Sequence, residues 1–272
     1  LFKSGDVFRG QLQPMSGRPG APIVYASYGE GGKPVIEPSF DASGTADWEK
    51  AGENLWRCGK PSDFELANVI FDHGDNGCGW KEDKLEQLGG RDLHFCWVQD
   101  EKALYMVSEA NPATRFTSIE LAEKKHCIAE EQCHDVCYNG LWLRYTGAHG
   151  IGGSGVKRIE ILNCDICWIG GSTLYIDDTG TGVRYGNGIE FWSSAEDVKV
   201  DHCTIWECWD AGITNQSNEP GMVQKNISYT NNLIWNCEYS FEYWNHPMKK
   251  INPNAAKYVY SDDAWLLTFT VF

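Results

Sequence analysis

The segment from Val156 to Asn245 states one pattern three times: VKRIEILNCDICWIGG (156–171), VKVDHCTIWECWDAGI (198–213) and QKNISYTNNLIWNCEYSFEYW (224–244). Superimposed without gaps, the repeats align Ile159 with Val198 and Ile227, Ile161 with Val200 and Tyr229, Cys164 with Cys203 and Asn232, and Ile166 with Ile205 and Ile234. Repeats of this size indicate a stacked architecture, in which each unit covers the hydrophobic side of its neighbour.

The content of one repeat indicates which stacked architecture this is. Short alternating runs such as IEIL (159–162) and VKV (198–200) end at Asn, Asp or Gly, and no apolar period of 3.6 residues is found. We therefore predict an all-β fold in which each repeat is one coil of a parallel β-helix. A Gly-rich insertion, GSTLYIDDTGTGVRYG (171–186), lengthens one of the coils.

Composition excludes several classes of function. The net charge is −15, which disfavours nucleic acid because phosphate binding requires a basic surface. The same charge disfavours a free polyanionic sugar unless a cation bridges it to the protein. The sequence has no apolar run long enough for a membrane span and no visible signal peptide, although it begins at Leu1 inside what looks like a coil.

The eleven cysteines allow two interpretations. The spacing of Cys164 and Cys167 with Cys203 and Cys208 resembles a zinc site. The repeat alignment instead places Cys164 under Cys203, and Cys208 under Cys237, which predicts columns of buried thiols that act as small hydrophobic residues.

The repeat pattern predicts four regions. Residues 1–45 form the first coils, 46–125 an inserted antiparallel β-rich domain, 126–246 the main coils, and 247–272 a C-terminal tail or cap. Within the insertion, LHFCWVQDEKALYMV (93–107) predicts a β-hairpin and WKEDKLEQLGG (80–90) a brief helix.

A run of motifs carries a family resemblance. These are GDVFRGQL (5–12), PIVYASYGEGGKPVI (22–36), LHFCWVQDEKALYMVSEANPATRFTSIELA (93–122), LRYTGAHGIGG (143–153), RYGNGIEFW (184–192), DAGITNQ (210–216) and NLIWNCEYSFEYWN (232–245). Over residues 1–247 the chain resembles secreted bacterial right-handed parallel β-helix proteins of the pectate-lyase-like superfamily. More narrowly, it resembles the glycoside hydrolase family with xylanase and α-L-fucosidase members. The resemblance implies a secreted polysaccharide-cleaving enzyme with a right-handed β-helix.

The coil register predicts where carboxylates gather. If Ile151, Ile189, Ile213 and Phe241 point inward, their next neighbours Gly152, Glu190, Thr214 and Glu242 point outward. Glu190 and Glu242 then stand two strand spacings apart, roughly 9–10 Å, near the upper end of the range for an inverting glycosidase. Asp210 aligns with Glu238 one coil on, about 5 Å away, the separation of a retaining pair. We predict Glu190, Asp210 and Glu242 as catalytic residues, against the alternative of a solvated or salt-bridged surface.

Other residues beside this column are candidates for substrate binding. Trp192, Gln216 and Trp244 share a second outward column, where the tryptophans would stack on sugar rings or, alternatively, pack under a loop. His149 is predicted to contact substrate or shuttle protons, or to bond backbone in a turn. Arg184 is a further substrate-binding candidate.

Adjacent acids in the insertion raise the question of a metal. Asp177 and Asp178 in YIDDTGTG (175–182) are first of all typical of an ordinary turn, and secondly of a calcium site. No cofactor is otherwise required by the predicted chemistry.

Three functions are consistent with these features. The first is hydrolysis of a plant-type or other polysaccharide by paired carboxylates. The second is a polysaccharide lyase, which needs a cation and a basic residue, for which Arg184, His149 and Lys249 are the candidates; the acidic groove and the scarcity of basic groups weigh against it. The third is a non-catalytic carbohydrate-binding β-helix.

Overall fold

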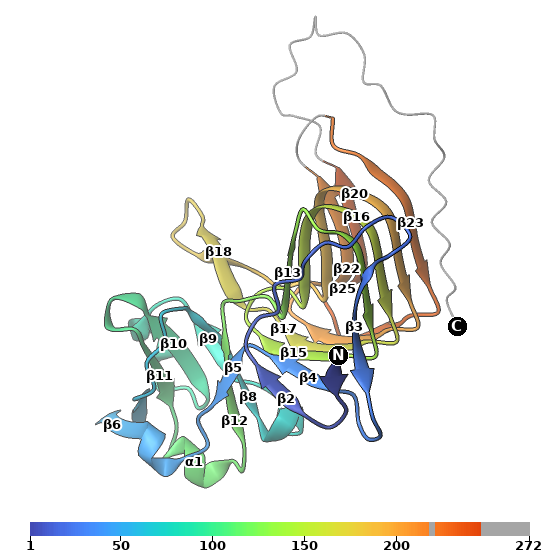
Figure 1. Cartoon of the computed structure of the whole chain (residues 1–272). Coiled ribbons are helices and arrows are strands. Elements are labelled where there is room, and N and C mark those ends of the chain that lie inside the picture. Colours follow the sequence, from blue (N-terminus) through green and yellow to red (C-terminus); the bar gives the residue numbers. More distant parts are fainter. Residues whose placement is uncertain (218–220, 246–272) are drawn as a thin grey trace, which may run out of the picture.

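The chain is all-β and is built mainly from parallel sheets. The computed structural model describes residues 1–217 and 221–245, so the predicted tail 247–272 lies outside the described residues. In the described part, two parallel sheets are stacked strand by strand, and an antiparallel unit lies beside them (Figure 1).

The larger parallel sheet has nine strands in the described ranges. Its members are β1 (Phe2–Lys3), β3 (Ile23–Tyr28), β13 (Ile128–Glu131), β14 (His134–Asn139), β16 (Ile151–Leu162), β20 (Ile189–Asp201), β22 (Ala211–Ser217), β23 (Gln224–Thr230) and β25 (Tyr239–Asn245). The second parallel sheet contains β2 (Val7–Arg9), β4 (Val35–Glu37), β15 (Trp142–Thr146), β17 (Asp165–Ile169), β21 (Thr204–Cys208) and β24 (Leu233–Trp235). Each successive pass of the chain adds a strand to both sheets.

The observed register confirms the repeat alignment. Ile159 pairs with Val198, which pairs with Ile227, while Ile205 lies between Ile166 and Ile234 in the second sheet. These aligned apolar side chains point inward and form a continuous buried core between the sheets. Burial of this column supplies the main stabilising contribution, because the hydrophobic effect scales with apolar area removed from water.

Bends in each pass occur at residues with left-handed backbone. Asn163, His202 and Asn231 occupy one such corner in three successive passes, with φ of 53°, 55° and 55°. Asn tolerates this conformation better than most residues, which explains why Asn recurs at the ends of strands in the repeats. A bend of the same hand recurs in every pass, so the chain returns to the start of the next strand in register.

The cysteine columns are also confirmed. Cys164 and Cys203 are buried at equivalent positions of consecutive passes, and buried Cys208 is followed one pass later by the partly buried Cys237. All are free thiols, and burial raises the pKa of the Cys208 thiol well above its ordinary value. Within residues 1–217 and 221–245, no group of three or more His, Cys, Asp or Glu side chains is placed to hold a metal ion. Cys164, Cys203 and Cys208 belong to the buried core cluster, and Cys237 packs against it.

One carboxylic acid lies inside the core between the parallel sheets. Glu130 on β13 is fully buried and its Oε1 accepts a hydrogen bond from the Tyr138 hydroxyl at 2.9 Å. Its Oε2 is buried without a hydrogen-bond partner. Burial raises the pKa of Glu130 to about 8, because the charged form loses its hydration.

This buried acid predicts a pH-dependent stability. The folded pKa of Glu130, about 8, lies above the unfolded value, so its contribution to stability is fully present below the unfolded pKa and is lost as pH rises through 8. Between the unfolded and the folded pKa, ionisation of Glu130 lowers the free energy of unfolding by up to about 1.4 kcal/mol per pH unit. We expect Glu130→Gln to abolish this component, so that the difference in Tm between variant and wild type grows in favour of the variant from pH 5 to pH 9. A difference that is constant over this range would contradict the prediction.

The antiparallel unit is inserted between β4 and β13. Its five-stranded sheet contains β6 (Trp48–Gly52), β7 (Leu55–Cys58), β9 (Trp80–Glu82), β10 (His94–Val98) and β11 (Ala103–Val107), and its three-stranded sheet contains β5 (Ser39–Asp41), β8 (Leu66–Phe71) and β12 (Ile119–Glu123). All pairings are antiparallel except that between β9 and β10. The unit has a hydrophobic core of its own, which includes Trp48, Phe95 and Leu121.

The local predictions for this insertion are confirmed. β10 and β11 form the expected hairpin, with Val98 paired to Ala103. The short helix predicted in 80–90 is the 3-10 helix η3 (Leu85–Leu88). The remaining short helices are η1 (Thr45–Asp47), η2 (Asp72–Gly74), η4 (Gln99–Glu101) and α1 (Pro112–Arg115). None of the helices in the described ranges is both long and apolar enough to cross a membrane.

The Gly-rich insertion 171–186 forms a hairpin beside the stacked strands. Its strands are β18 (Ser172–Ile176) and β19 (Gly182–Tyr185), and it projects from the stack next to the antiparallel unit (Figure 1). The Thr173 hydroxyl donates a hydrogen bond to Oε1 of Glu65 in that unit at 3.0 Å, and Lys81 donates to the carbonyl of Gly171 at 2.9 Å. Contacts from the antiparallel unit thus hold the base of the hairpin in place.

Candidate active site

The predicted outward column is present in the structure. Gly152 pairs with Glu190, Glu190 with Thr214, and Thr214 with Glu242, on β16, β20, β22 and β25. The inward partners follow the predicted register, since Ile189 is paired on its two sides with Ile151 and Ile213. Parallel pairing thus brings acids from distant parts of the sequence onto one face of the sheet.

Asp210 joins this group from the residue before β22. Its backbone amide donates to the Gly186 carbonyl at 3.2 Å, and its own carbonyl accepts from the Glu238 amide at 2.9 Å. Burial raises the pKa of the Asp210 carboxyl to about 6, and the negative charges of Glu242, Glu238 and Glu190 add to the shift. The electrostatic coupling means that all three predicted catalytic carboxylates share one site.

Glu190 is held by two donors on one oxygen. Asn187 donates from Nδ2 to Oε2 of Glu190 at 2.6 Å, and Nε2 of His149 lies 3.1 Å from the same oxygen. The Asn187 amide is itself oriented, because its Oδ1 accepts from the Ala211 backbone amide at 2.8 Å. Burial raises the pKa of Glu190, and the Asn187 hydrogen bond opposes that shift. Both donors act on Oε2, so the carboxylate has a fixed orientation.

Glu242 is oriented by its neighbours in the adjacent strand. Gln216 donates from Nε2 to Oε2 of Glu242 at 2.5 Å, and the Thr214 hydroxyl lies 3.4 Å from that oxygen. Gln216, which we predicted to contact substrate, is buried and serves to position this carboxylate. Its column partners are as predicted, since Gln216 pairs with Trp192 on one side and Trp244 on the other. The Trp192 residue is partly buried beside the acids.

Arg184 lies on β19 and is engaged with the antiparallel unit. It donates from Nη2 to Oδ1 of Asp83 at 2.9 Å, and its guanidinium lies 5.5 Å from the centre of the Trp209 ring. Asp83 also accepts from the Gly182 backbone amide at 3.0 Å. The observed role of Arg184 is therefore to link the hairpin to the inserted unit.

The acidic pair at the hairpin tip forms a turn. Oδ1 of Asp177 accepts from the backbone amides of Thr179 and Thr181 at 2.8 and 2.9 Å. The Thr179 hydroxyl also donates to this oxygen at 2.7 Å, and that bond together with the backbone bonds lowers the pKa of Asp177 and closes the loop between β18 and β19. Asp177 and Asp178 thus occupy the turn position that the sequence favoured first, at the end of the hairpin and away from the column of acids.

Sequence reasoning missed three residues of this site: His126, Asn187 and Tyr185. His126 stacks on His149 with ring centres 5.1 Å apart and planes 10° apart. The Tyr185 ring also packs edge-on against His149, with ring centres 5.0 Å apart. Burial lowers the pKa of His149 to about 3 and that of His126 to about 4, so both are neutral near pH 7. The signals in the sequence were the position of His126 where the coil pattern resumes, and the RYGNGIEFW motif that contains Tyr185 and Asn187.

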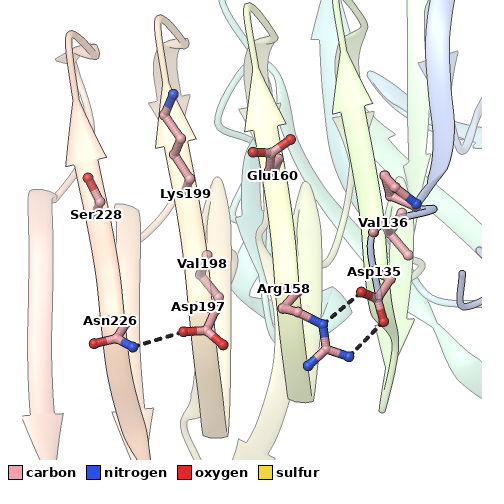
Figure 2. Close-up of a pocket in the computed structure, with 11 residues that line it drawn as sticks. Asp135, Val136, Arg158, Glu160, Asp197, Val198, Lys199, Asn226 and Ser228 are labelled. Atoms are coloured by element: carbon pink, nitrogen blue, oxygen red, sulfur yellow. Dashed lines mark hydrogen bonds and ion pairs between the residues drawn. The ribbon is translucent and has the colours of Figure 1, made fainter. Parts of the chain in front are cut away.

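A separate depression of about 510 Å³ lies on another part of the large sheet (Figure 2). Its polar side chains pair with one another along the stack: Arg158 contacts Asp135 through two bonds of 2.7 Å, and Asn226 donates to Asp197 at 2.9 Å. Glu160 also lines it. These lateral pairs belong to the outer surface of the strands, and the depression does not include the carboxylates described above.

The fold is similar to two solved structures. One is the complex of XylC with xylose, at 13% identity and a TM-score of 0.50, where the match covers 90% of this chain and 60% of the other. The second is a protein named glycoside hydrolase, at 8% identity and a TM-score of 0.59, covering 86% of this chain and 65% of the other. This chain thus spans less than two thirds of the length of either. No protein-family model matches the sequence, and a search of curated proteins finds no match. At these identities the likeness shows the fold alone.

Proposed function

We propose that this chain is the catalytic part of a secreted glycoside hydrolase with a right-handed parallel β-helix, interrupted by the antiparallel unit. The observation that carries the proposal is the Asp210 carboxyl, whose pKa is raised to about 6 by burial and by three neighbouring carboxylates. A carboxylic acid whose pKa is raised toward neutral pH, beside a second, oriented carboxylate, is the arrangement that glycosidic cleavage requires.

The roles of the carboxylates follow from their surroundings. Asp210 protonates the glycosidic oxygen as its bond to the sugar carbon breaks. Glu190, oriented by Asn187 and His149, then accepts a proton from the attacking water or itself attacks the sugar carbon. Glu242 contributes a negative charge that keeps the proton on Asp210. Trp192 and Trp244 are proposed to stack on neighbouring sugar rings.

The charge of the site favours an uncharged glycan. The carboxylates of Glu190, Glu238 and Glu242 would repel a uronate, and Arg184 is already paired with Asp83. A lyase would need a base in this place. Nδ1 of His149 already accepts a hydrogen bond from the Asn187 backbone amide, and burial lowers the pKa of His149 to about 3, which makes it a poor base. The xylose bound to XylC, a structurally similar protein, agrees with a neutral sugar. Calcium at Asp177 and Asp178 is not needed for this chemistry.

Product analysis separates the three candidate functions. Incubated with neutral xylan and, separately, with polygalacturonate, the protein is expected to release new reducing ends from the neutral polymer alone. The products should not absorb in the ultraviolet, because hydrolysis creates no double bond. Ultraviolet-absorbing products would establish a lyase instead. Binding of a glycan without any cleavage would establish a non-catalytic module.

A further inference from the structure

The histidine stack beside Glu190 is one end of a repeated hydrogen-bond pattern. The backbone amide of His149 donates to Nδ1 of His126 at 3.1 Å. The backbone amide of Asn187 donates to Nδ1 of His149 at 3.0 Å. The Ala211 amide then donates to Oδ1 of Asn187 at 2.8 Å. In each pass, a side chain before the strand accepts a bond from the backbone of the next pass.

This pattern determines the tautomer of both rings. A backbone amide is always a donor, so Nδ1 of His126 and Nδ1 of His149 are acceptors and carry no proton. Because both imidazoles are neutral near pH 7, the proton of each lies on Nε2. In His149 that Nε2–H points at Oε2 of Glu190. His126 presents an equivalent donor one pass earlier.

The ring of His126 fills a position in the outward column that has no side chain of its own. A Cβ atom added to Gly152 would lie 2.9 Å from the His126 ring, so the imidazole lies directly over this glycine. Gly152 pairs with Glu190, which places His126 one strand spacing from the carboxylate. In the part of the chain that the structure describes, the hydrogen bond of the His126 ring is made by Nδ1, and the side chain is partly exposed, so that Nε2–H can reach a ligand.

We propose that His126 is a substrate-binding residue, whose Nε2–H donates a hydrogen bond to an uncharged hydroxyl of the sugar unit bound beside Glu190. The proposal rests on the function proposed above and assigns one contact within that site. A neutral donor suits a neutral sugar, since it binds a hydroxyl oxygen without adding a positive charge that would hold a uronate. His149 and Asn187 are positioning residues. The His149 backbone amide orients the His126 ring, and the side chains of His149 and Asn187 orient Glu190.

Kinetics test this contact with three variants of the full chain. His126→Leu removes the donor and is expected to raise KM for xylo-oligosaccharides by about 2- to 10-fold, the range for one neutral hydrogen bond. His126→Gln, whose Nε2 amide can occupy the same position, should restore much of the loss. Gly152→Ala should mimic His126→Leu by displacing the ring. An unchanged KM in both His126→Leu and Gly152→Ala, with Tm unaltered, overturns the proposal.

A spectroscopic experiment separates this proposal from the hydrolase assignment. In ¹⁵N-labelled Asp210→Asn protein at pH 7, the His126 and His149 rings should both show a protonated Nε2 and an unprotonated Nδ1. Addition of neutral xylo-, gluco- or galacto-oligosaccharides should shift the Nε2 resonance of His126, while His202, an exposed histidine on another corner, serves as the control. If wild type hydrolyses nothing but this shift occurs, the hydrolase assignment fails and the contact stands. A protonated Nδ1 in His126, or no His126 shift with any of the sugars, refutes the contact.

Discussion

Asp210→Asn is expected to lower kcat for glycoside hydrolysis by about 10²- to 10⁴-fold, the usual contribution of a general acid. An amide keeps the size of the side chain but cannot protonate the leaving oxygen. The backbone bonds of Asp210 to Gly186 and Glu238 do not involve the carboxyl group, so the fold should be retained. The measurement is kcat on the neutral substrate identified by product analysis, together with Tm.

The pH profile gives an independent test of the same role. A general acid works in its protonated form, so wild-type activity should fall as pH rises through about 6, the pKa of Asp210. The residual activity of Asp210→Asn should lack this alkaline limb. Glu160→Gln is the matched control, because Glu160 also points outward from β16 but lies in the separate depression of Figure 2. Full activity in Asp210→Asn, or an equal loss in Glu160→Gln, would exclude the proposed site.

Gly186→Ala is expected to destabilise the protein by about 2–4 kcal/mol, combining steric overlap with backbone strain. A Cβ at Gly186 would lie 2.0 Å from the Cα of Gly170, and Gly186 has a φ of +152°. Backbone atoms cannot move aside as a flexible side chain can, so the two segments would have to separate. The change should lower Tm by about 4–8 °C, as measured by thermal unfolding.

The same substitution should also impair the active site. The Gly186 carbonyl accepts from the Asp210 amide, and Asn187, which orients Glu190, is the next residue. Gly32→Ala is the control, since a Cβ there meets no atom within 4 Å. If Gly186→Ala unfolds no earlier than Gly32→Ala, the close approach of Gly170 and Gly186 does not hold the hairpin, and the argument from steric overlap is wrong.

The positions of the outward acids could be predicted from the sequence because parallel stacking in register converts an alignment of repeats into a spatial column. Glu190, Thr214 and Glu242 are neighbours for the same reason that Ile189, Ile213 and Phe241 are. The same reasoning correctly placed the cysteine columns. Side-chain identity at aligned positions was sufficient wherever the contact partner was the equivalent residue of the next pass.

The remaining features depend on contacts that repeat alignment does not contain. The side chains of His126 and Asn187 accept hydrogen bonds from backbone amides of the following pass. Every residue except proline has such an amide, so the sequence does not indicate which one will be the donor. The partner of Arg184 is Asp83, 101 residues away in the inserted unit, where no repeat relates the two. Glu130 violates the rule that acids are rarely buried, and only the adjacent Tyr138 hydroxyl accounts for its place.

Both large interruptions of the stack leave it at one corner. The antiparallel unit follows β4 and the 172–185 hairpin follows β17, and each of these strands pairs with β15 at corresponding positions. Segments inserted at this corner change the residues around the carboxylates of the candidate site, while the apolar core between the two parallel sheets is unchanged. Under the proposed function, we expect exchange of such segments to alter sugar selectivity, and grafting a different hairpin between Gly171 and Gly186 is a direct way to measure that change while the stacked strands stay the same.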